Sequence, residues 1–278
     1  MTTDDRRAIL ITGCSSGIGL DAARTLAARG WRVFAACRKR ADVERLAAEG
    51  LESLRLDYEK PATIAEAAGA ALERSGGRLD ALFNNGAYAV PGFLEDMPVE
   101  AMRAIFEANF LGWHDLTRRV LPAMRARRRG RIVQCSSVLG FAAVRWRGSY
   151  VATKFALEGY TDTLRMELRG SGVAVSLIEP GPIATRFNEN AYAEFERWID
   201  PAASAHRHEL GEIARRYRGG AGGGYFTLPP SAVTRRLIHA VESRRPCARY
   251  RVTTPTNVVA ALKRFAPGWA LDRLMERN

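Results

Sequence analysis

The sequence has few cysteines and no long apolar run. Its four cysteines lie far apart, with no Cys-x-x-Cys pair, which argues against a metal site or a disulfide framework and favours a reducing cytoplasm. No stretch of about 18 apolar residues exists, so we expect no membrane-spanning helix. The polar start, Met1 to Arg7, lacks the apolar core of a signal peptide. We therefore expect a cytoplasmic protein without a metal.

Acidic residues are scarce in two stretches. The chain carries a net charge of +12, and the seven arginines between Arg118 and Arg131 have no acid among them. From Arg235 to Asn278 there are ten Lys or Arg and three acids. A basic face can bind nucleic acid, anionic lipid or a phosphorylated ligand, although a solvated surface is the commoner explanation. Aromatic residues are absent between Arg118 and Arg131, which argues against stacking on a single strand, so we expect no nucleic-acid partner.

Apolar runs of strand length alternate with segments of helical spacing as far as about residue 180. This alternation predicts a Rossmann-type α/β fold, a doubly wound parallel sheet with helices on both faces, in one domain over residues 1–278. Such sheets bind ligands beyond the carboxyl ends of their strands. The predicted strands are 8–12, 31–37, 51–56, 79–84, 131–136 and 173–178, and the predicted helices are 19–29, 41–49, 63–75, 98–121 and 149–169. We expect the longest helix to end or kink at Pro122.

Two C-terminal segments follow. Residues 186–230 contain an Arg/Glu-rich segment with a helical pattern, followed by a glycine cluster. This combination predicts a mobile flap over the site. Residues 231–278 form a basic extension in which we expect one helix and a short strand. Apolar side chains lie among its cations, as in an amphipathic segment resting on anionic lipid, although Pro267 and Gly268 would interrupt any single helix. Packing against its own subunit is the alternative that we favour.

The first predicted strand ends in a glycine-rich turn, Thr12-Gly13-Cys14-Ser15-Ser16-Gly17-Ile18-Gly19. Glycines permit a tight turn and let the backbone approach a pyrophosphate, and the following helix offers unpaired N–H groups. A glycine cluster alone is weak evidence, but its place between a strand and a helix favours a dinucleotide site. The residues expected to bind the phosphates are Gly13, Ser15, Ser16, Gly17, Ile18 and Gly19.

The second predicted strand ends in cations. A site for NAD usually keeps a carboxylate here for the ribose 2′-hydroxyl, whereas this chain has Arg38, Lys39 and Arg40. Cations suit a 2′-phosphate, so we predict NADP rather than NAD, with Arg38 as the principal contact. An ordinary charged surface loop is the alternative. Asp57, at the end of the third strand, either accepts from the adenine amino group or caps a turn.

Tyr150 and Lys154 are four residues apart and therefore share one face of a predicted helix. A tyrosine, whose ordinary pKa is about 10, becomes a better acid/base when a nearby ammonium lowers its pKa. As an isolated pair, Tyr and Lys at this spacing are usually surface residues. Ser137 follows a strand, where a hydroxyl can bind a substrate oxygen or simply cap a turn. Asn109 lies on the apolar face of its helix, so we expect its amide to be hydrogen-bonded, either to local backbone or in a site.

Taken together, these residues resemble the short-chain dehydrogenase/reductase family. The resemblance covers residues 8–190 closely and includes the glycine turn, Asn84-Asn85-Gly86-Ala87, the four residues above, and Pro180-Gly181-Pro182-Ile183-Ala184-Thr185. Within the family, the glycine turn and the segment Lys154 to Gly159 are most similar to the 17β-hydroxysteroid and retinol dehydrogenase branch.

The resemblance implies a role for each residue of the site. Tyr150 exchanges a proton with the carbonyl or alcohol oxygen, and Ser137 orients that oxygen. Lys154 binds the nicotinamide ribose and lowers the Tyr150 pKa, while Asn109 holds a water that links Lys154 to solvent. The other cofactor contacts implied are Asp57, Asn85, Gly86, Ala87, Pro180, Gly181, Ile183 and Thr185. The resemblance further implies a homodimer or homotetramer that pairs the helices of Asn109 and Tyr150.

One departure from the family is the order Gly86-Ala87, where Ala-Gly is usual. Both residues are small, so we expect a shifted backbone φ but retained binding.

The candidate pocket wall is aromatic and apolar, which favours a hydrophobic carbonyl substrate such as a steroid, retinoid, aldehyde or ketone. Two nearby arginines favour an acidic substrate instead. The wall comprises Val138, Leu139, Phe141, Val144, Trp146, Tyr192, Phe195 and Trp198. The alternatives to an enzyme are an NADP(H) sensor and a basic surface-binding protein on the same fold.

Overall fold

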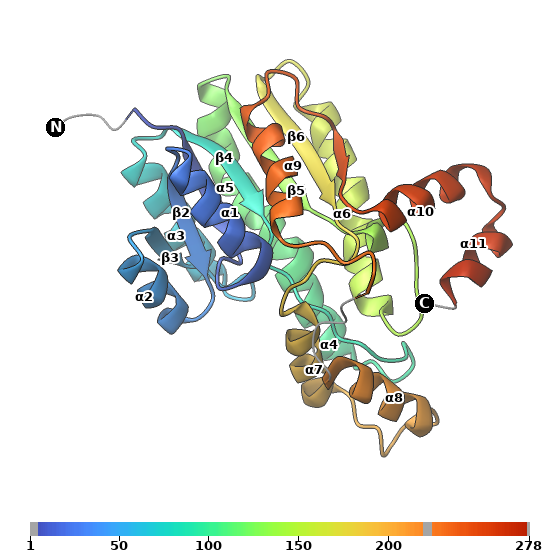
Figure 1. The fold of residues 1–278 in the computed structure, drawn as a ribbon. Coiled ribbons are helices and arrows are strands. Elements are labelled where there is room, and N and C mark those ends of the chain that lie inside the picture. The colour runs from blue at the N-terminus through green and yellow to red at the C-terminus, as the bar shows by residue number, and fades with distance from the viewer. Residues whose placement is uncertain (1–4, 219–223, 277–278) are drawn as a thin grey trace.

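A computed structural model describes residues 5–218 and 224–276. Seven strands form one sheet in the order β3-β2-β1-β4-β5-β6-β7 (Figure 1), and every neighbouring pair is parallel. The predicted doubly wound sheet is therefore confirmed. The strand order reverses between β1 and β4, the place where such sheets bind ligands. The strands are β1 (Ala8–Thr12), β2 (Arg32–Cys37), β3 (Glu52–Arg55), β4 (Leu79–Asn84), β5 (Gly130–Cys135), β6 (Val173–Glu179) and β7 (Arg249–Arg251).

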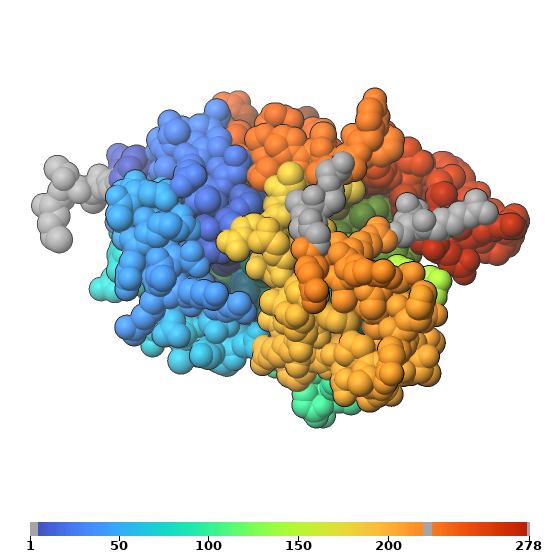
Figure 2. All heavy atoms as spheres, turned by 60° about the horizontal axis from the view of Figure 1, so that its bottom comes forward, coloured from blue at the N-terminus to red at the C-terminus, as the bar shows by residue number. Residues whose placement is uncertain are grey.

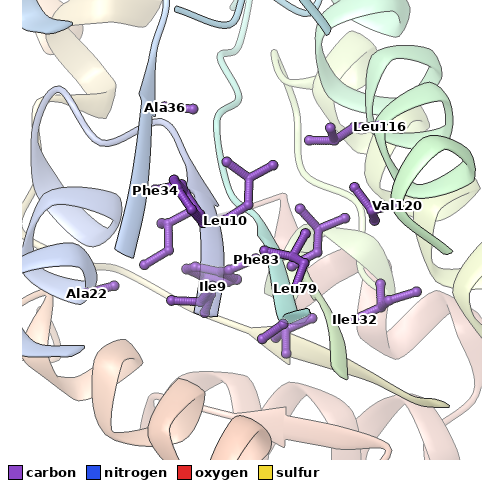
Figure 3. Close-up of a cluster of buried hydrophobic side chains, with 14 of the residues drawn as sticks. Ile9, Leu10, Ala22, Phe34, Ala36, Leu79, Phe83, Leu116, Val120 and Ile132 are labelled. Atoms are coloured by element: carbon purple, nitrogen blue, oxygen red, sulfur yellow. The ribbon is translucent and has the colours of Figure 1, made fainter. Parts of the chain in front are cut away.

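Helices cover both faces of the sheet because its central strands are apolar on both sides. Helices α1 (Gly17–Ala28) and α9 (Ser231–Glu242) lie together on one face, and α3 (Pro61–Arg74), α5 (Gly112–Ala126) and α6 (Gly148–Glu167) lie on the other (Figure 1). Helix α2 (Arg40–Ala48) packs beside β2 and β3. Figure 3 shows this core, with Ile9, Leu10 and Phe83 between Ala22 of α1 and Leu116 of α5.

The helix predicted over 98–121 consists of three parts. Helix α4 (Val99–Phe106) passes into a π-helical turn, Glu107–Leu111, and then into α5. The expected end at Pro122 is wrong, because α5 continues to Ala126. Val120 and Met124 are fully buried on either side of Pro122, and their packing outweighs the hydrogen bond that the proline cannot make.

Two helices follow β6 beyond the carboxyl edge of the sheet, α7 (Phe187–Trp198) and α8 (Arg207–Arg218) (Figure 1). Figure 2 shows this edge, with the yellow and orange residues of α7 and α8 beside the blue and cyan N-terminal part. The helical part of the expected flap is thus present, whereas its mobility stays a prediction. Of the glycine cluster, Gly219, Gly220, Gly222 and Gly223 lie outside the described residues.

The expected C-terminal extension of one helix and one strand is wrong, because β7 is accompanied by three helices, α9, α10 (Thr254–Phe265) and α11 (Gly268–Met275). The Thr253 side chain caps α10 by accepting from the backbone of Thr256. The interruption expected at Pro267 and Gly268 is confirmed. No described helix has the length and apolar character needed to cross a membrane.

Candidate active site

The glycine turn after β1 is held tightly against the loop that follows β4. Gly13 has a φ of 69°, and a Cβ on it would lie 2.7 Å from Gly86 Cα. A Cβ on Gly19 would lie 2.3 Å from the Gly13 carbonyl oxygen. The side chain of Ser16, the N-cap residue of α1, makes no hydrogen bond to the first turn of the helix. Backbone N–H groups at a bare helix end beside a small-residue turn fit the pyrophosphate of a dinucleotide.

Thr12 organises this edge of the sheet. Its hydroxyl accepts from the backbone of Asn85 (2.8 Å) and Gly86 (3.2 Å) and from the Tyr58 hydroxyl (2.8 Å). The Asn85 side-chain amide donates to the Thr12 carbonyl (3.0 Å), so in this structure it ties two loops together. Neither Gly86 nor Ala87 has a positive φ. The exchanged Gly-Ala order therefore causes no backbone strain.

The expected adenosine side of the site lies at the ends of β2 and β3. Arg38 is exposed. Burial raises the pKa of Glu59, and the positive charge of Arg38 partly opposes this rise. Asp57 caps a turn, since its carboxylate accepts from the backbone of Glu59 (3.2 Å). Arg45 of α2, which sequence reasoning missed, donates to the Ser15 carbonyl (2.7 Å). No local motif marks Arg45, because the contact joins two separate elements.

Lys154 is buried one helical turn after Tyr150 on α6. Its Nζ donates to the Cys135 carbonyl (2.8 Å) and lies 4.3 Å from the centre of the Trp113 ring and 5.5 Å from that of the Tyr150 ring. Burial lowers the pKa of Lys154 to about 8. The ammonium therefore faces the tyrosine from inside the protein, where little water competes with it.

Tyr150 is 7% exposed and lies beside the Ser137 side chain. Burial raises the pKa of Tyr150, and the neighbouring Ser137 side chain and the charge of Arg147 only partly oppose this. The net lowering of the Tyr150 pKa expected from the sequence is thus not found in this structure, because desolvation of the phenolate dominates. Ser137 is fixed in turn, since its hydroxyl accepts from the backbone of Leu139 (3.1 Å).

Asn109 lies in the π-helical turn and is fully buried. Its side-chain oxygen accepts from the backbone of Tyr88 (3.1 Å), and its nitrogen donates to the Tyr88 carbonyl (2.8 Å) and to the Thr153 hydroxyl (3.3 Å). The expectation that this amide is hydrogen-bonded is confirmed. Asn109 connects the loop after β4 to α6, next to the pair Tyr150 and Lys154.

The segment after β6 borders the site in two places. Thr185 lies against the glycine turn, because a Cβ on Gly17 would lie 2.9 Å from its methyl group. Ile183 forms a β-bridge with Leu228. Further back, the Pro180 carbonyl accepts from Val138 (2.8 Å), and Gly181 is enclosed by the hydroxyls of Thr253 and Thr256. Thr185 is therefore the residue of this segment that the structure brings to the turn.

An apolar cluster surrounds Tyr150. The Phe187 ring packs edge-on against it, with ring centres 5.4 Å apart. Most of the expected pocket wall belongs to this cluster, namely Val138, Leu139, Val144, Trp146, Tyr192, Phe195 and Trp198. Phe141 packs instead with a neighbouring group that includes Leu271 and Met275 of α11.

Comparison with known proteins places the chain in a family. The model of the short chain dehydrogenase family matches residues 7–195. The chain is 42% identical to uncharacterized oxidoreductase YbbO of Escherichia coli (strain K12), over 98% of this chain and 94% of that one. It is 34% identical to retinol dehydrogenase 8 of Bos taurus, over 96% and 88%. The crystal structure of a short chain dehydrogenase/reductase from Burkholderia phymatum in complex with NAD is 27% identical and superposes with a TM-score of 0.78, covering 95% of this chain and 94% of that one.

The chain therefore belongs to the short-chain dehydrogenase/reductase family, and its resemblance to the retinol dehydrogenase branch is confirmed. It is an oxidoreductase that uses a nicotinamide dinucleotide.

Proposed function

We propose that the protein interconverts a hydrophobic carbonyl compound and its alcohol with NADP(H), with Tyr150 as the acid/base. The observation that carries this proposal is the setting of the Tyr150 hydroxyl. It lies beside Ser137 and a buried Lys154 and is surrounded by an apolar cluster. A hydrophobic substrate in contact with this cluster would bring its oxygen to the Tyr150 and Ser137 hydroxyls.

A nicotinamide dinucleotide bound at the glycine turn would supply hydride to the carbonyl carbon or accept it from the alcohol. In reduction, Tyr150 gives its proton to the substrate oxygen, so that C=O becomes CH–OH. The raised pKa of Tyr150 keeps the phenol protonated at neutral pH, as a proton donor must be. Lys154 stabilises the phenolate that forms and binds the nicotinamide ribose, Ser137 orients the substrate oxygen, and Asn109 holds a water next to Lys154.

For the cofactor we propose NADP rather than NAD. Arg38, Lys39 and Arg40 are exposed directly after β2, and no carboxylate stands among them. A guanidinium at this place pairs with a 2′-phosphate, which a ribose hydroxyl cannot match. The remaining contacts are those expected from the sequence, from the glycine turn to Asn85, Gly86, Ala87, Ile183 and Thr185.

Turnover of a carbonyl panel tests the acid/base role. NADPH oxidation is followed with aldehydes, ketosteroids and retinal for wild type and Tyr150→Phe. We expect the variant to lose about 10²- to 10⁴-fold in kcat/KM, because the proton donor is removed. Tyr160→Phe, ten residues further along the same helix, is the matched control and should keep its activity. Equal turnover by wild type and Tyr150→Phe would exclude Tyr150 as the acid.

The same assay tests the cofactor. Arg38→Ala should raise the KM for NADPH by about tenfold or more, since it removes a charged hydrogen bond, and should leave the KM for NADH unchanged. Arg169→Ala, which removes an exposed arginine just after the end of α6, is the control. If NADH serves as well as NADPH and Arg38→Ala changes nothing, the preference for NADP is wrong.

We also propose a homodimer or homotetramer that pairs α5 and α6 with their copies. These helices border a pocket of about 390 Å³ lined by Leu121, Pro122 and Leu164 among others. Leu111, just before α5, and Met166 on α6 are 43% and 59% exposed. A copy of the same helices would cover these apolar side chains.

A further inference from the structure

The helices α10 and α11 form a hairpin whose outer surface exposes large apolar side chains. Val258 is 50% exposed, Phe265 82% and Trp269 70%. Figure 1 shows the hairpin projecting from the body of the protein beside α6, and in Figure 2 its red residues form one end of the molecule. Isolated exposed apolar residues are normal, but two aromatic residues at one projecting tip point to a binding surface.

The exposure has a regular pattern. Val258, Ala261 and Phe265 are spaced by three and then four residues, so they share one face of α10, and all three are exposed. The opposite side is occupied by the protein itself, because Val259 of α10 and Met275 of α11 are buried in one apolar cluster. The sequence left two alternatives for this segment, packing on its own chain and contact with lipid. The structure shows packing on the inner side and leaves an apolar outer side.

Cations lie beside the aromatic tip. Lys263 and Arg264 directly precede Phe265, and Arg273 lies one turn after Trp269. Lys263 is anchored, since its Nζ donates to the Phe141 carbonyl (2.5 Å) and lies 4.9 Å from the Phe155 ring centre. Aromatic residues with neighbouring Lys and Arg are suited to the interface of an anionic bilayer. A second copy of the chain would bring the same cations to the same face, and the whole chain carries +12.

We propose that the α10–α11 hairpin docks the protein on the surface of an anionic lipid bilayer, with Phe265 and Trp269 inserted at the interface. The inner side of the hairpin packs with Val138, which directly follows Ser137, and with Phe141, three residues further along. Docking therefore holds the candidate active site next to the lipid phase, where hydrophobic carbonyl compounds dissolve. That last step rests on the proposed function, whereas docking itself does not.

Vesicle flotation with the full chain tests the proposal. We expect binding to vesicles of phosphatidylcholine mixed with phosphatidylglycerol, little binding to phosphatidylcholine alone, and weakening by salt. The double variant Phe265→Ser/Trp269→Ser should lower the partition coefficient by about tenfold or more, because two aromatic side chains are no longer buried in lipid. Leu94→Ser/Val99→Ser removes apolar residues that are 63% and 57% exposed elsewhere, and it should bind like wild type.

Docking would be overturned if wild type did not float with the vesicles, or if Phe265→Ser/Trp269→Ser floated equally well. It would also be overturned if this double variant changed oligomeric state in light scattering, because the face would then bind a second copy of the chain. Thermal melting checks that each variant is folded. NADPH oxidation with a water-soluble aldehyde separates the two proposals. Turnover without vesicle binding defeats only the docking surface, and vesicle binding without turnover defeats only the proposed function.

Discussion

Arg249 is the residue with the most buried ionic contacts around α6. Its guanidinium bonds to Glu158, to Asp162 (2.5 Å) and to Glu179 (3.0 Å), and Arg251 approaches Glu179 from the same strand (3.4 Å). These ion pairs join α6 to β6 and β7. Glu158 lies one turn after Lys154, so the helix that carries the candidate catalytic pair is held in place from its buried side.

Glu158 should make stability depend on pH. Burial raises its pKa from 4.5 to about 7, and the neighbouring Glu179 acts in the same direction, while Ser136 and Arg249 oppose it. A carboxyl whose pKa is higher in the folded state binds its proton more tightly there, so its contribution is complete below about pH 4.5 and is lost as pH rises to about 7. We expect Glu158→Gln to flatten the fall in unfolding free energy over this range.

Urea unfolding at a series of pH values measures this slope. Glu167→Gln, an exposed acid on the same helix, is the control and should keep the slope of wild type. An unchanged slope in Glu158→Gln would show that Glu158 titrates normally in the folded protein.

At the scale of elements, most of the sheet could be predicted because its strands are short apolar runs that alternate with segments of helical spacing. The strand over residues 8–12 and that over 79–84 have the predicted bounds. The π-helical turn could not be predicted, since Asn109 is held there by hydrogen bonds to Tyr88, which lies in the loop after β4. Helix α10 was missed although Thr253 and Pro255 form an ordinary helix start.

The candidate site divides in the same way. Tyr150, Lys154 and Ser137 could be found from spacing and from their places after a strand or on a helix. Thr12 and Tyr58, which hold the loops together, could not be found because their hydrogen bonds join residues far apart in the chain. The raised pKa of Tyr150 also depends on burial, which short-range patterns do not give.

Two glycines offer a matched test of the turn before α1. Gly19→Ala places a Cβ 2.3 Å from a backbone oxygen that cannot rotate away, so we expect a loss of about 1–3 kcal/mol in stability and weaker dinucleotide binding. Gly159→Ala, on the exposed side of α6, meets nothing within 4 Å and should gain about 0.5–1 kcal/mol. Urea unfolding and calorimetric titration with NADPH measure both effects. A Gly19→Ala protein with wild-type affinity would show that the turn is not the phosphate site.

At the scale of the molecule, arginines of the stretch from Arg118 to Arg131 form ion pairs with acids that lie outside this stretch. Arg119 pairs with Asp115 (2.9 Å) at the start of the helix, and Arg127 pairs with Asp80 of β4 (2.8 Å). The stretch therefore contributes less to an unpaired basic face than its sequence indicates. This supports a structural role for these arginines over nucleic-acid binding.

Oligomeric state tests the proposed α5–α6 pairing. Met166→Glu places a charge on that face, near the end of α6, so we expect size-exclusion chromatography with light scattering to show smaller particles than for wild type. Leu94→Glu, equally exposed but outside the face, should not change the mass. A Met166→Glu protein of unchanged mass would place the contact on another surface.

The contacts of Arg249 also bear on the order in which the chain acquires its shape. Arg249 follows Glu158 by 91 residues and Glu179 by 70. Since a growing chain leaves the ribosome from its N-terminus, β1 to β4 emerge early. The three carboxylates around α6 have no ion pair with Arg249 until that residue has been synthesised. Until β7 arrives, β6 also remains an open sheet edge. The nascent protein should therefore form the glycine turn after β1 well before Tyr150 is fixed, and β7 is the last strand to join the sheet.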